Sequence, residues 1–153
     1  MGRGESLGPT DWGPPVLWMG VILWFSSDAW SASHTGALLI PLLRWLLPWV
    51  SVGQLTTLHA GIRKLAHLGE YAALALLWYR AFARRRDTGA GAAAQWALVI
   101  TVGWAGVDEG RQVFTLSRTA SLRDVAIDSV GAALALVAAR IGRAIRARRR
   151  RAG

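Results

Sequence analysis

Residues 92–107 read AAAQWALVITVGWAGV, an apolar run without a charged residue that ends abruptly in Asp108 and Glu109. The run approaches the roughly 20 residues that a membrane-spanning helix needs. It lacks the lasting alternation of apolar and polar residues that is typical of a strand. Three other mainly apolar runs occupy residues 16–25, 55–82 and 125–141. Together the four runs predict an all-α, polytopic membrane protein with about four transmembrane helices.

A fifth apolar stretch, residues 37–50, differs from these runs because Pro41, Arg44 and Pro48 interrupt it. It is too short and too interrupted for a span. We therefore expect an interfacial or re-entrant segment that lies across the ends of the spanning helices. The polar residues 110–123 are expected to form a loop. We divide the chain into a flexible Gly-rich tail at residues 1–11, a transmembrane domain at residues 12–142 and a basic cytoplasmic tail at residues 143–153.

The composition is both apolar and basic: 53% of the 153 residues are hydrophobic, and the formal charge is +9. The absence of Cys excludes a disulfide scaffold, a Cys-ligated zinc site, an iron–sulfur cluster and a thiol nucleophile. Nucleic-acid binders with an apolar core and membrane proteins with cationic flanks both combine these two features. The positions of the charges must decide between the two classes.

With four spans and both termini on one side, that side carries twelve cations against three acids. These cations include Arg84, Arg85, Arg86 and the seven Arg residues from position 140 onward. The other side carries six cations and six acids. The positive-inside rule therefore predicts that both termini lie in the cytoplasm. We expect the Arg-rich end to attract anionic lipid. No nucleic-acid partner is expected, because no aromatic residues are interleaved with the Arg run.

One polar cluster, Lys64, His67, Glu70 and Tyr71, lies where the run at residues 55–82 enters the membrane. Lys and Tyr at a helix end often mark only the interface. Glu70 is different because wholly apolar residues follow it. A carboxylate inside the bilayer costs about 2.5–3.5 kcal/mol on insertion scales and usually faces a bundle interior or a water-filled cavity. We therefore treat the cluster as a candidate site.

A second cluster consists of Asp108, Glu109 and Gln112, which share about 100° of a helix surface. A solvated helix end is the plainer interpretation, although acids at a helix C-terminus are unfavourable. Compensation by Arg111, Arg118 or a ligand is therefore expected.

The third cluster lies around the start of the run at residues 125–141 and contains Arg118, Asp124 and Asp128. Asp124 fits a helix cap or a first-turn acid. Asp128 lies one turn deeper on the same face, where capping does not account for it. Arg118 can hold a carboxylate or a phosphate with two parallel hydrogen bonds.

These clusters predict an extracytoplasmic pocket of mixed charge. It fits a buried structural ion network, a site for a zwitterionic or phosphate-bearing head group, or a hydrolytic site. The sequence signals no metal and no cofactor, since it has no His pair at ligand spacing and no phosphate-binding or dinucleotide motif.

The chain resembles the VanZ-like family of small bacterial membrane proteins. The resemblance covers about residues 16–142 and rests on Phe25-Ser26-Ser27, Lys64-x-x-His67-x-x-Glu70-Tyr71 and Asp108-Glu109-x-x-Gln112-x-Phe114-x-x-x-Arg118-x-x-Ser121-x-x-Asp124-x-x-x-Asp128-x-x-Gly131. Two positions depart from the family pattern: Asp28 stands where the family often has Gln, and Arg111 stands where it commonly has His. The resemblance implies a multi-span helical protein of the bacterial cytoplasmic membrane, and some members are associated with resistance to the glycopeptide teicoplanin.

We therefore expect a non-enzymatic membrane protein that binds a lipid or cell-envelope head group, or a lipidated glycopeptide. One alternative is an intramembrane enzyme that acts on a phosphate- or ester-linked envelope lipid, with paired carboxylates as acid and base. The other alternative is a scaffold for membrane proteins.

Overall fold

The computed structural model describes residues 8–85, 88–112 and 121–152, with the side chain of residue 112 left out. No strand occurs in these ranges, which confirms the predicted all-α class. The elements are α1 (Pro9–Phe25), the short 3-10 helix η1 (Asp28–Trp30), α2 (Ala32–Leu46), α3 (Val52–Ala83), α4 (Ala90–Gln112) and α5 (Leu122–Ala152).

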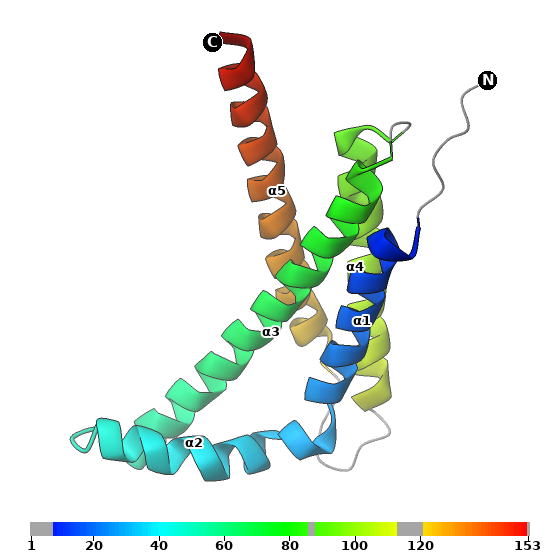
Figure 1. The fold of residues 1–153 in the computed structure, drawn as a ribbon. Helices are drawn as coiled ribbons and strands as arrows, with labels where there is room; N and C mark the ends of the chain where they lie inside the picture. The colour runs from blue at the N-terminus through cyan, green and yellow to red at the C-terminus, as the bar shows by residue number, and fades with distance from the viewer. Residues whose placement is uncertain (1–7, 86–87, 113–120, 153) are drawn as a thin grey trace.

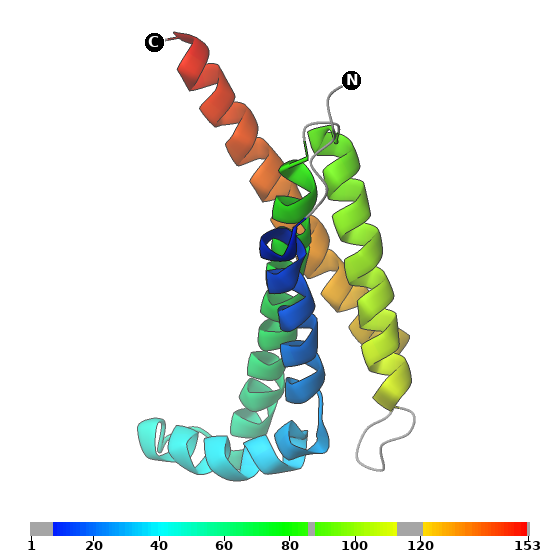
Figure 2. The same ribbon diagram turned by 45° about the vertical axis from the view of Figure 1, so that its right-hand side comes forward.

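The helices form an open bundle around α3, which crosses α5 and also packs against α1, α2 and α4 (Figure 1). The start of α1, the end of α5 and the junction of α3 with α4 lie at one end of the molecule. Helix α2 lies across the other end, and the view in Figure 2 shows the same arrangement. Residues 37–46 of the segment predicted to be interfacial or re-entrant belong to α2.

Small residues allow the central helices to approach closely. One buried cluster joins α3, α4 and α5 through Ala75, Ala93 and Ala132. At the crossing of α3 and α5, a Cβ atom on Gly131 would lie 2.7 Å from the carbonyl oxygen of Leu68. Helices in membranes use small residues in this way, because lipid supplies no hydrophobic force to drive them together.

Large apolar side chains cover the outward faces of the bundle. Leu17 of α1, Trp96 of α4 and Leu134 of α5 are all exposed by more than half. A soluble protein rarely exposes so much apolar surface. Among the described helices, α4 and α5 are long and apolar enough to cross a membrane. The prediction of four spans is therefore supported only for these two.

Helix boundaries differ from the predicted ones at three places. Helix α1 begins at Pro9, inside the stretch expected to be flexible, because Pro is tolerated in a first turn and the Asp11 carboxylate accepts the N–H of Gly8 at 3.4 Å. The expected loop at residues 110–123 is shorter, since α4 continues to Gln112 and α5 begins at Leu122. Helix α5 also continues through the basic segment to Ala152, since Arg is a good helix former and cations are favoured near a helix C-terminus.

Candidate functional site

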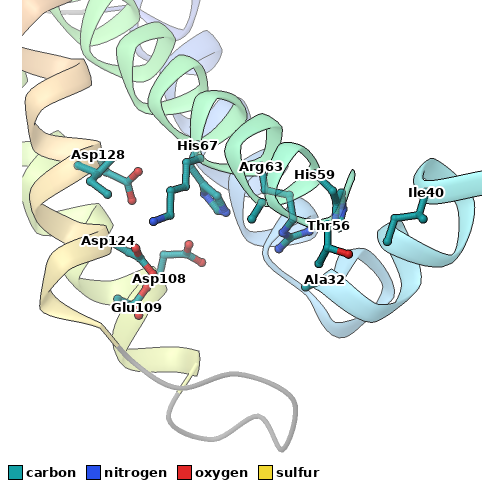
Figure 3. A pocket seen from close by; sticks show the side chains of 13 residues that line it. Ala32, Ile40, Thr56, His59, Arg63, His67, Asp108, Glu109, Asp124 and Asp128 are labelled. Atoms are coloured by element: carbon teal, nitrogen blue, oxygen red, sulfur yellow. The ribbon is translucent and has the colours of Figure 1, made fainter. Parts of the chain in front are cut away.

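A cavity of about 400 Å³ lies between α2, α3 and the adjoining ends of α4 and α5 (Figure 3). It lies at the end of the molecule opposite the Arg-rich end of α5. Thirteen residues line it: Ala32, Ile40, Thr56, His59, Ala60, Arg63, Lys64, His67, Asp108, Glu109, Asp124, Ile127 and Asp128.

The α3 wall of the cavity carries cationic and imidazole groups. His59, Arg63 and His67 recur every four residues, so they share one face of the helix. Figure 3 shows them on the same side of the cavity. Lys64 adds an ammonium group to this wall. The α3 wall is therefore predominantly basic.

Two of these groups hold α2 against α3. The Nε2 atom of His59 lies 3.1 Å from Oγ1 of Thr35. Arg63 donates to the same hydroxyl at 3.0 Å and to the carbonyl oxygen of Trp30 at 2.7 Å. Burial lowers the pKa of His59, and the nearby Arg63 charge lowers it further. His59 therefore favours its neutral form in the docked helix pair.

The opposite wall is acidic, and its best-connected member is Asp108 of α4. This carboxylate is 2% exposed. Its Oδ2 atom accepts hydrogen bonds from the Ser26 hydroxyl at 2.7 Å and from the Tyr71 hydroxyl at 3.4 Å. Its Oδ1 atom lies 3.7 Å from a guanidinium nitrogen of Arg111 and has no hydrogen bond to a described residue. Asp108 thus joins α1, α3 and α4 behind the cavity.

Glu109 and Asp124 shape the start of α5. Glu109 accepts a hydrogen bond from the backbone N–H of Ser121, so it joins the end of α4 to the first turn of α5. Asp124 lies in that first turn, as expected for an acid that favours a helix N-terminus. Both carboxylates also line the cavity (Figure 3).

Asp128 lies one turn further along α5 and faces the cavity (Figure 3). It is 7% exposed, and no hydrogen bond or ion pair joins it to another group in the described part of the chain. Lys64 likewise has no ion pair with a described carboxylate. A buried carboxylate without a partner is costly, which makes Asp128 the strongest candidate for contact with a ligand.

The ten residues predicted for the site fall into three groups. Tyr71 and Glu70 lie next to the cavity, where Tyr71 supports Asp108 and the Glu70 carboxylate lies 3.7 Å from Nδ1 of His67. The Gln112 side chain and Arg118 lie outside the described residues. The other six line the cavity: Lys64, His67, Asp108, Glu109, Asp124 and Asp128.

The sequence argument missed several residues of the site. His59 and Arg63 were not predicted, although their four-residue spacing from His67 placed all three on one stripe. Ser26 was not among the predicted site residues, but it is buried and donates to Asp108. The α2 residues Ala32 and Ile40 carried no signal, because only the tertiary packing brings them to the cavity.

The arrangement places a mainly basic wall opposite an acidic one across a space that can hold a small polar group. Such a site can bind a molecule that carries both charges, and its buried carboxylates favour a cation on the α5 side.

Comparison with known proteins gives one family: residues 14–143 match the VanZ/LLP1 family. A search of curated proteins and a search of solved structures gave no significant match.

Proposed function

Because the chain belongs to the VanZ/LLP1 family, we propose that it is a multi-pass protein of the bacterial cytoplasmic membrane that binds the polar head group of a lipid or another envelope component. The observation that carries this proposal is the cavity of about 400 Å³ with oppositely charged walls. Its size lies within the range of about 300–1,000 Å³ that is usual for small-molecule sites.

The proposed spans are α1, α4, α5 and the part of α3 that follows Lys64. Helix α1 has 17 residues, which corresponds to about 26 Å at 1.5 Å per residue and is slightly shorter than a bilayer core of about 30 Å. Helix α2 would lie in the outer interface, where its exposed Trp45 fits the headgroup region. The first turns of α3 pack against α2 outside the bilayer core.

The charge distribution supports an orientation with both termini in the cytoplasm. The exposed cations Arg84 and Arg148 belong to the end that holds the start of α1 and the end of α5. Cytoplasmic loops carry an excess of Lys and Arg, so the cavity would open on the extracytoplasmic side. The Arg-rich end of α5 would contact anionic lipid, which attracts each nearby cation by about 1 kcal/mol.

The mixed lining of the cavity favours an amphiphilic ligand. Apolar side chains of Ile40 and Ile127 line the same space as the charged groups. A free ion would gain no binding energy from these apolar side chains. A lipid could contact them with its glycerol backbone while its head group contacts the charged groups.

Retention of lipid by the purified protein tests the proposal. We expect the double variant Lys64→Gln/Asp128→Asn to lose bound phospholipid severalfold, measured by native mass spectrometry in a mild detergent. The control Asp28→Asn/Arg44→Gln makes the same charge changes at exposed positions that do not line the cavity, and it should retain the lipid.

Equal lipid retention in both double variants would contradict binding in the cavity. Failure of the cavity variant to insert or fold would instead indicate a structural ion network. Chemical conversion of the lipid by the purified wild-type protein would favour an intramembrane enzyme over a binding protein.

We also propose a link to resistance against teicoplanin-type glycopeptides through the same cavity. Expression in a susceptible bacterium should then raise the inhibitory concentration of teicoplanin, and the Lys64→Gln/Asp128→Asn variant should not.

A further inference from the structure

We infer that the cavity selects a zwitterionic head group, in which an ammonium and a phosphate are separated by a few bonds. The inference rests on the proposed function and names the class of head group. Asp128 and Asp124 of α5 receive the ammonium, and Lys64 of α3 receives the phosphate.

The acidic side of this site depends on Asp128. Its carboxylate is more than nine-tenths buried, faces the cavity and has no partner among the described residues (Figure 3). Asp124 lies one turn earlier on the same helix and also lines the cavity. A bound cation would remove the cost of leaving the Asp128 charge buried and uncompensated.

An organic ammonium fits these carboxylates better than a metal ion does. No three His, Asp or Glu side chains within the described ranges converge closely enough to hold a metal. A primary ammonium has three hydrogen-bond donors, so it can bind two carboxylates that approach from different turns.

The basic side offers Lys64, because its neighbours on α3 already have partners. Arg63 is hydrogen-bonded to Thr35 and Trp30, and His67 lies beside Glu70. Lys64 lines the cavity but forms no ion pair across it with the carboxylates of α4 or α5. Lys64 and Asp128 therefore do not neutralise each other directly within the described part of the chain, and a zwitterion placed between them satisfies both.

Two short-chain lipids with the same acyl chains separate this inference from simple phosphate binding. Dihexanoyl phosphatidylethanolamine carries an ammonium, and dihexanoyl phosphatidylglycerol does not. We expect the full-length protein in nonionic detergent to bind the ethanolamine lipid at least about tenfold more tightly, measured by isothermal titration calorimetry. The preference has a physical reason, because a ligand without a cation leaves the buried carboxylate unpaired.

Variants assign this preference to individual groups. Asp128→Asn should remove most of the tenfold preference by weakening only the ethanolamine lipid, whereas Lys64→Gln should weaken both lipids. The matched control Asp28→Asn changes an exposed carboxylate that does not line the cavity, and it should leave both affinities unchanged. If Asp128→Asn fails to fold, Asp124→Asn provides the same test in the first turn of α5.

The outcomes distinguish the two proposals. Equal affinity for the two lipids, with both weakened by Lys64→Gln, would leave head-group binding intact and overturn the zwitterion. A preference that survives in folded Asp128→Asn and Asp124→Asn would also overturn it. Binding of neither lipid to the wild-type protein would remove both proposals.

Free phosphoethanolamine identifies the source of the ligand: weak binding supports a lipid-borne zwitterion, and binding as tight as that of the lipid supports a soluble one.

Discussion

At the scale of single residues, Gly131 sets the distance between the two walls of the cavity. It allows α5 to approach the backbone of Leu68 on α3. One turn before this crossing, α5 carries Asp128 and α3 carries Lys64. The same close contact that packs the two helices therefore also places the two charged groups on facing walls.

Replacing Gly131 by Ala tests this role. The added Cβ would lie 2.7 Å from the Leu68 carbonyl oxygen, so the helices must separate. We expect a loss of about 1–3 kcal/mol in stability, as for other overpacked sites, with a lower thermal midpoint and weaker lipid binding. The control Gly103→Ala has nothing within 4 Å of the new Cβ, and it should be neutral or slightly stabilising. Equal effects of the two substitutions would rule out the close-contact role.

The sequence predicted which residues line the cavity better than it predicted their contacts. Helical spacing placed Asp124 and Asp128 on one face of a helix, and the structure brings both to the cavity. Spacing within one helix cannot show that Lys64 lies on the facing wall, since that depends on how α3 and α5 cross. Glu70 attracted attention because a carboxylate in a bilayer is costly, but the structure places it beside His67 and outside the lining.

At the scale of elements, α2 completes the cavity by docking on the first turns of α3. The contact is close: Cε1 of His59 would lie 3.4 Å from a Cβ added to Gly36. His59 and Thr35 supply the polar part of this interface. The docking of α2 therefore involves a titratable imidazole ring.

Acidification should weaken the docking of α2. Burial and the Arg63 charge lower the pKa of His59 when α2 is docked, whereas an undocked ring titrates near its ordinary pKa of about 6.5. The undocked state thus binds more protons, and the docked state loses stability as the pH falls below about 6.5. Hydrogen–deuterium exchange, corrected for intrinsic rates, should show faster exchange in α2 at pH 5.5 than at pH 7.5. His59→Gln should abolish most of this difference, and an unchanged pH dependence in the variant would contradict the assignment.

The helical elements were predictable from apolar runs, and their ends were not. All four apolar runs lie within helices, and so do residues 37–46 of the interrupted stretch, despite Pro41 and Arg44. The errors lie where polar residues extend a helix, as at the Arg-rich end of α5 and beyond Asp108 in α4. Arg has a high helix propensity, so a charge run can end an apolar segment without ending the helix.

At the scale of the whole molecule, charge and chemistry occupy opposite ends of the bundle. The formal charge of +9 comes mainly from the end that carries the α5 terminus. The opposite side of the predicted topology carries six acids and six cations. Four of these acids and two of these cations, Arg63 and Lys64, line the cavity. The positive-inside rule uses only the first of these features, so orientation and binding can be tested independently.

Labelling of single cysteines tests the orientation directly, because the chain contains no Cys. Ser33→Cys lies on α2 at the cavity end, and Ala147→Cys lies near the end of α5; both positions are exposed. With both termini in the cytoplasm, a membrane-impermeant maleimide should label Ser33→Cys in intact cells and Ala147→Cys only after permeabilisation. Leu17→Cys, on the apolar outer face of α1, serves as a control that should resist labelling in both conditions, because lipid excludes the reagent. The reverse pattern at positions 33 and 147 would place the cavity on the cytoplasmic side. Labelling of both positions in intact cells would place them on the same side of the membrane, which would contradict the odd number of crossings proposed between α2 and the end of α5.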